Sequence, residues 1–186
     1  APPEKGTRRR RAGWYRLVWA VAMTIGAGVA FAAGGLASSV NFQLTAHSGE
    51  PVTAEDFKGG HSLVYFGYTH CPDVCPLGLA TVSAALNEMG SRANDLKPFF
   101  VTIDPKRDTA KHLAQYVSAF HPAIVGVTGP LPQIRVLANA LGARFVLATL
   151  KDKVIVDHTD AMYLLGPDGQ LVTRFDQGVT PRELVR

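Results

Sequence analysis

One stretch of the sequence, Ser62 to Pro76, constrains the fold more than any other. It reads SLVYFGYTHCPDVCP and contains both cysteines of the 186-residue chain, Cys71 and Cys75. Its first residues are apolar and rich in β-branched and aromatic types, which predicts a buried strand leading into the cysteines. Each cysteine precedes a proline, which disfavours the α conformation, while Pro76 suits the first residue of a helix. We therefore expect Cys75 near a helix N-cap, where the helix dipole favours a thiolate.

Strand and helix patterns alternate after the cysteines. Helices are expected from Pro76 to about Gly90, over 109–120 and over 131–141, with strands over 97–104, 123–127 and 144–149 between and after them. A hairpin over 41–53 precedes this series, and a second hairpin around Gly166-Pro167-Asp168-Gly169 and a helix from Thr180 follow it. This order predicts an α/β fold, thioredoxin-like, with an N-terminal β-hairpin and an inserted helix and hairpin.

Charge is unevenly distributed along the chain. Residues 1–40 hold six Lys and Arg against one acid, which leaves 13 basic and 14 acidic residues in the remainder. The globular part is therefore near neutral and lacks the basic surface expected of a nucleic-acid-binding protein. A charge-free run from Leu17 to Leu36 follows the arginines and is long enough to cross a bilayer as a helix.

These features predict three parts: a basic cytoplasmic tail (1–13), a single transmembrane anchor (14–38) and an exported domain (39–186). A cleavable signal ending near Ala30-Phe31-Ala32 is the alternative, and it exports the domain as well. The expected location is the inner membrane, with the domain in the periplasm, or in the intermembrane space if the source is eukaryotic.

The two cysteines admit three interpretations. A structural disulfide is the default for an exported domain, but the loop it would close is too short to stabilise much. Redox catalysis usually relies on C-x-x-C, whereas three residues separate Cys71 from Cys75. Two thiolates holding one soft metal ion is the third interpretation.

Among the histidines, His158 is the best candidate for a third ligand. It ends a strand-like run, Val154 to Asp157, just before the strand at Met162. In a thioredoxin-like sheet that loop lies beside the cysteine loop and carries a cis-proline in oxidoreductases, yet no proline occurs between Pro132 and Pro167. Two thiolates and an imidazole suit copper as Cu(I) or Cu(II), whereas a structural zinc site needs a fourth ligand.

The remaining histidines receive less specific interpretations. His47, His61 and His112 are expected to be solvated, and His121 to cap a helix end. His70 adjoins Cys71 and is expected to support the site rather than bind the ion.

Three blocks of sequence resemble the Sco/SenC family of copper-binding, thioredoxin-like proteins: FGYTHCPDVCP (66–76), VTIDPKRDT (101–109) and VDHTDAMYLLGPDG (156–169). The resemblance implies that Cys71, Cys75 and His158 bind copper. It also implies that the protein assists assembly of the binuclear copper centre of cytochrome c oxidase subunit II, with other copper chaperones or thiol reductants as further partners. Asp104, Asp108 and Asp157 lie in the same blocks and are expected to serve in capping and turns, with Asp157 a candidate for orienting His158.

The main alternative is a thiol-disulfide oxidoreductase in which Cys71 attacks and Cys75 resolves the mixed disulfide. A redox or copper sensor is a third. A metallochaperone is not an enzyme, so enzymatic activity is expected only under the oxidoreductase alternative.

Overall fold

The computed structural model describes residue 36, residues 40–150 and residues 153–186. The predicted tail and, apart from Leu36, the predicted anchor lie outside the described residues. Within the described part, no helix is long and apolar enough to cross a membrane. Leu36 is buried in the domain core and donates its backbone N–H to the carbonyl of Gly169 at 2.9 Å. Leu36 is therefore part of the packed domain, although the sequence pattern assigned it to the anchor.

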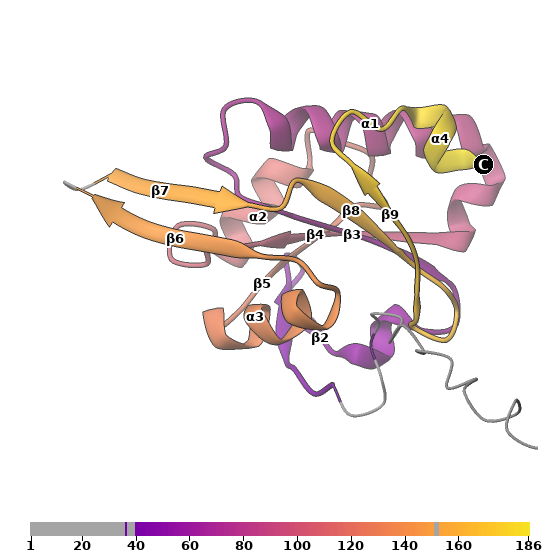
Figure 1. Cartoon of the computed structure of the whole chain (residues 1–186). Coiled ribbons are helices and arrows are strands. Elements are labelled where there is room, and N and C mark those ends of the chain that lie inside the picture. The colour runs from indigo at the N-terminus through magenta and orange to yellow at the C-terminus, as the bar shows by residue number, and fades with distance from the viewer. Residues whose placement is uncertain (1–35, 37–39, 151–152) are drawn as a thin grey trace, which may run out of the picture. The chain divides into compact units, whose positions relative to one another are not determined.

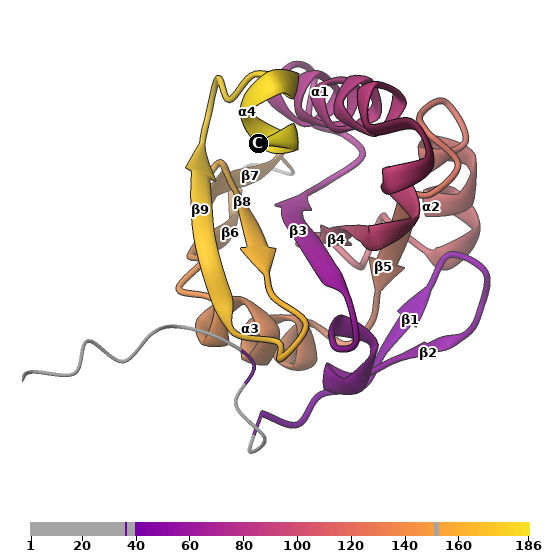
Figure 2. The same ribbon diagram turned by 90° about the vertical axis from the view of Figure 1, so that its right-hand side faces the viewer.

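A seven-stranded mixed sheet forms the centre of the domain, in the order β2-β1-β5-β4-β3-β8-β9 (Figures 1 and 2). β3, β4 and β5 are parallel, while β1 pairs antiparallel with β5, and β8 antiparallel with β3. Their bounds are β1 Leu44–Ala46, β2 Pro51–Val52, β3 His61–Gly67, β4 Leu96–Thr102, β5 Val125–Thr128, β8 Ala161–Leu165 and β9 Leu171–Asp176. The predicted thioredoxin-like α/β fold with an N-terminal hairpin is confirmed.

Helices cover both faces of this sheet. The helices α1 (Val74–Met89), α2 (Ala110–Val117) and α4 (Pro181–Val185) lie on one face, and α3 (Leu131–Ala140) lies on the other (Figure 2). The short 3-10 helices η1 (Ala54–Phe57) and η2 (Gly90–Asp95) complete the set. Alternate residues of β3 face opposite cores: Tyr65 packs with α1 and α2, whereas Phe66 packs with α3. Both faces of β3 are buried, as its apolar run predicted.

The remaining strands, β6 (Phe145–Leu150) and β7 (Lys153–His158), form a separate antiparallel hairpin that projects from the sheet (Figure 1). The pair Phe145 and His158 lies at its base. The hairpin is inserted between α3 and β8, and it delivers His158 to the chain segment that enters β8. The predicted strand over 144–149 is confirmed, although it is not part of the main sheet.

Candidate metal centre

The two cysteines lie where β3 gives way to α1. Cys71 follows β3 in a loop and donates its backbone N–H to the carbonyl of Tyr68 at 3.2 Å. Cys75 is fully buried and Cys71 is 8% exposed, and both are free thiols. The loop is tied to the body of the domain through Thr69, whose backbone N–H donates to Asp108 at 3.0 Å. The sequence thus places both thiols at the end of a central strand, as expected.

The start of α1 differs from the prediction. Asp73 is the N-cap and Val74 the first helical residue, so Cys75 lies inside the first turn rather than at the cap. A proline disfavours the α conformation of the residue before it, yet Cys75 adopts this conformation as the second residue of α1. Pro76 is the third helical residue, where a backbone N–H has no partner within the helix and its loss costs no hydrogen bond. The prolines therefore do not hold Cys75 off the helix.

Burial controls the protonation of Cys75. Removal of the thiol from water is the largest of the effects that together raise its pKa to about 12; the backbone amide of Tyr68 lowers the pKa, while the neighbouring thiol of Cys71 adds to the rise. The expectation that the helix dipole would favour a thiolate at Cys75 is wrong, because desolvation outweighs the dipole. A metal ion that binds Cys75 at neutral pH must displace a proton.

His158 ends β7 and is partly buried. Its Nδ1 lies 3.1 Å from the carbonyl oxygen of Thr159. A carbonyl can only accept, so Nδ1 carries the proton and the lone pair of a neutral ring is on Nε2. Metal-binding histidines commonly use this arrangement, in which a backbone carbonyl fixes the ring and leaves the other nitrogen for the ion.

Tyr68 lies beside both Cys71 and His158. Its backbone carbonyl accepts from the Cys71 N–H, and its ring packs edge-on against His158 at 6.2 Å between centroids. Among the described residues, the donor atoms of Cys71, Cys75 and His158 do not all lie within 4.8 Å of one another. The structure therefore brings the two cysteines together but holds His158 beyond bonding reach of a shared ion.

A tyrosine and an aspartate near the thiols had no distinctive sequence signal. The Tyr65 hydroxyl donates to Asp160 Oδ1 at 3.0 Å and lies 3.2 Å from the carbonyl of Val74. This contact links β3, the first turn of α1 and the segment just after His158. Burial raises the pKa of Tyr65 strongly, so the hydroxyl stays a hydrogen-bond donor. The one sequence signal that could have indicated a role for Asp160 is its position two residues after His158.

Several polar residues depart from their predicted roles. Asp108 is fully buried and accepts hydrogen bonds from Thr69 and Thr102, rather than capping α2, whose N-cap is Thr109. His112 is not simply solvated, because its Nε2 lies 3.0 Å from the Thr69 hydroxyl. His47 likewise accepts a hydrogen bond from the backbone of Gly126, at 3.0 Å.

The other histidines and acids agree better with expectation, apart from His121. His61 is exposed, as expected. The expectation for His121 is wrong: the C-cap of α2 is Ser118, and His121 Nδ1 accepts from the backbone N–H of Ala123 instead of capping the helix. Asp104 is buried and forms an ion pair with Arg107 three residues later, as a turn residue would. The side chain of Asp157 lies outside the described part of the chain.

The fold and the paired thiols at the end of a central strand define the class of protein: a thioredoxin-like domain with a dithiol centre. Comparison with known families is more specific. The SCO1/SenC family model matches residues 33–186, and the chain belongs to this family.

Individual relatives agree with the family assignment. The human mitochondrial protein described as an SCO1 homologue is 42% identical over 148 residues, which is 77% of this chain and 49% of that protein. The chain thus spans about half the length of this curated relative.

Several similar solved structures were determined with copper bound, including those of Bradyrhizobium japonicum ScoI and yeast Sco1. The structure of Bradyrhizobium japonicum ScoI is 37% identical, with a TM-score of 0.72, and the match covers 78% of this chain and 93% of that one. Copper-bound yeast Sco1 is 32% identical, with a TM-score of 0.70, over 78% of this chain and 82% of that one.

Proposed function

We propose that this protein is a copper metallochaperone in which Cys71, Cys75 and His158 bind the ion. The observation that carries the proposal is the pair of adjacent free thiols on one loop, together with a histidine at the base of the β6–β7 hairpin whose Nδ1 is bonded to a carbonyl, which leaves the lone pair on Nε2. Two sulfur donors select Cu(I), and the imidazole allows Cu(II) to be held as well. The copper-bound structures of two relatives support copper as the ion.

Separation of His158 from the thiols is consistent with a carrier. A site that is complete before the ion arrives releases it slowly, whereas a site closed by one mobile ligand exchanges more readily. On transfer, one ligand of the acceptor enters as His158 or a thiolate leaves, so that the ion is never free. The raised pKa of Cys75 assists release, because a proton competes with the ion for that sulfur.

The acceptor that we propose is subunit II of cytochrome c oxidase, at its binuclear copper centre. This assignment rests on membership of the SCO1/SenC family, together with the resemblance of three sequence blocks described above. We further propose that the anchor predicted over residues 14–38 holds the domain in the inner membrane but ends before Leu36, which packs in the domain core, with residues 1–13 in the cytoplasm and the domain on the opposite side. The run of 20 uncharged residues from Leu17 to Leu36, flanked by arginines on one side only, supports this topology.

Thiol-disulfide exchange by Cys71 and Cys75 is the rival function, and a genetic experiment separates the two. A strain that lacks this protein is complemented with the wild type, Cys71→Ser, His158→Ala or the control His61→Ala, and oxidase activity is measured. Copper transfer predicts that Cys71→Ser and His158→Ala both fail, while His61→Ala complements. Full complementation by His158→Ala together with failure of Cys71→Ser would favour exchange chemistry instead.

A further inference from the structure

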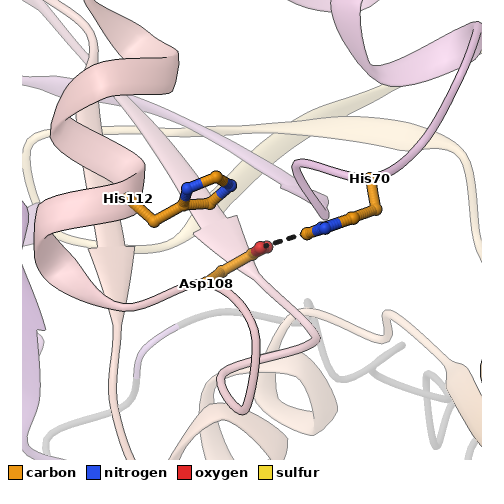
Figure 3. Close-up of side chains that lie close together, drawn as sticks. All are labelled: His70, Asp108 and His112. Carbon is orange, nitrogen blue, oxygen red and sulfur yellow. Dashed lines mark ion pairs between the residues drawn. The ribbon is translucent and has the colours of Figure 1, made fainter.

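Three potential metal ligands meet outside the proposed copper centre. His70, from the loop after β3, lies beside Asp108 and His112, at the start of α2 (Figure 3). One donor atom from each lies within 4.8 Å of the other two, and among the described residues this is the one group of three or more such side chains. The two imidazole rings stack at 5.7 Å between centroids.

The three donor atoms surround a common point. The hydroxyl oxygen of Thr69 lies 3.1 Å from His70 Nδ1, 3.0 Å from His112 Nε2 and 2.5 Å from Asp108 Oδ1. The hydroxyl satisfies all three, because it donates to the carboxylate and accepts from both rings. Rotation of the Thr69 side chain frees the point at which the three donors converge.

Hydrogen bonds already fix the carboxylate of Asp108 in position, and the partly exposed histidines give an ion access to it from solvent. Asp108 Oδ2 accepts from the Thr102 hydroxyl at 2.6 Å and from the Thr69 backbone N–H at 3.0 Å. Oδ1 faces the histidines and lies 3.7 Å from His70 Nδ1. The Asp108 side chain is fully buried, whereas that of His70 is 47% exposed. An ion can therefore reach Asp108 Oδ1 from solvent, and this carboxylate does not need to reorganise to bind it.

We propose that His70, His112 and Asp108 form a second metal site, which binds a divalent transition-metal ion through two imidazole nitrogens and one carboxylate oxygen. Nitrogen and oxygen donors without sulfur bind Cu(II) most tightly among the divalent first-row ions. The choice of copper as the physiological ion rests on the proposed function, whereas the site itself does not. Because His70 adjoins Cys71, one loop would carry a Cu(II) ligand and a Cu(I) ligand side by side.

The test uses the full chain with the first site removed by Cys71→Ser, Cys75→Ser and His158→Ala. This protein is titrated with Cu(II) against a competing chelator and examined by electron paramagnetic resonance and optical absorption. We expect one tightly bound Cu(II) per chain, with nitrogen hyperfine splitting and no sulfur-to-copper charge-transfer band. Adding His112→Gln or His70→Gln should weaken binding at least tenfold, since even supporting residues of metal sites contribute that much.

Two controls make the result decisive. Glutamine keeps a donor for Thr69, so His112→Gln preserves the hydrogen bond while it removes the imidazole, and thermal unfolding verifies the fold. His61→Gln removes an exposed histidine at the start of β3 and should leave Cu(II) binding unchanged. Equal Cu(II) affinity with and without His112→Gln, or no Cu(II) binding at all, would show that the cluster is only a hydrogen-bond network. Neither outcome affects the proposed function, which depends on the ligands already removed.

Discussion

Substitution of Asp108 by asparagine tests whether this buried carboxylate anchors the cysteine loop. Asp108 accepts three hydrogen bonds: from the Thr69 backbone, the Thr69 hydroxyl and the Thr102 hydroxyl. Asparagine can keep its oxygen at the position that serves two of these donors, but it places an NH2 group against the third. Hydrogen bonds to a charged acceptor contribute about 1.5–3 kcal/mol and neutral ones about 0.5–1.5 kcal/mol.

The expected loss follows from these values. One bond is lost and two lose their charge assistance, which is partly offset because a buried charge no longer has to be desolvated. We expect Asp108→Asn to lower the free energy of unfolding by about 2–3 kcal/mol. For a chain of this size that corresponds to a fall in Tm of roughly 4–12 °C. Thr69 lies two residues before Cys71, so Cu(I) affinity should fall as well.

The assay is urea and thermal unfolding of the reduced protein, followed by circular dichroism. Asp73→Asn is the matched control, because Asp73 lies in the same loop, is exposed and makes no side-chain capping bond. That control should change stability by less than about 0.5 kcal/mol. Equal stability of the two variants would refute the anchoring role of Asp108.

Three further predictions concern the surroundings of the thiols. In Gly67→Ala the new Cβ would lie 2.6 Å from the Phe100 ring and 2.8 Å from Cys75 Sγ. This overpacking should lower the free energy of unfolding by about 1–3 kcal/mol. The control Gly60→Ala should leave it unchanged, because the nearest atom to its new Cβ lies at 3.8 Å. Tyr65→Phe removes the bond to Asp160 and should speed amide hydrogen exchange just after His158; unchanged exchange would contradict this link. Burial raises the pKa of Cys75 to about 12, so its proton must leave when Cu(I) binds, and competition titrations should show that this thiol still increases the affinity about tenfold per pH unit above pH 9.0; a contribution that levels off near pH 9.0 would contradict the raised pKa. The same raised pKa favours the folded apoprotein below pH 9.0, and this contribution is lost as the pH rises towards 12.

Local sequence signals predicted most of the fold because each element carries its own pattern. The apolar run before Cys71 became the central strand β3, and the turn at Gly166 to Gly169 joined β8 and β9. The capping box at Thr180 and Glu183 started α4 as expected. The start of α1 was predicted too late, because a proline in the first turn of a helix and a proline at its first residue look alike in sequence.

The site was less predictable, because its properties depend on burial and on contacts between distant segments. The prolines after Cys71 and Cys75 indicated the local backbone conformation, but they did not indicate that Cys75 would be buried deeply enough to raise its pKa. Asp108 resembled a helix cap in sequence, yet it receives hydrogen bonds from Thr69, 39 residues earlier. No periodicity relates those two positions. The same holds for His70 and His112, which meet only because the loop after β3 and the start of α2 lie side by side.

Anaerobic titration of the reduced full chain with Cu(I), against a competing chelator, tests the central claim most directly. The account predicts one tightly bound Cu(I) per chain, loss of that site in Cys71→Ser and in Cys75→Ser, and at least tenfold weaker binding in His158→Ala. His61→Ala, which removes an exposed histidine, should bind as the wild type does. Wild-type affinity in His158→Ala would contradict the proposed three-ligand copper site.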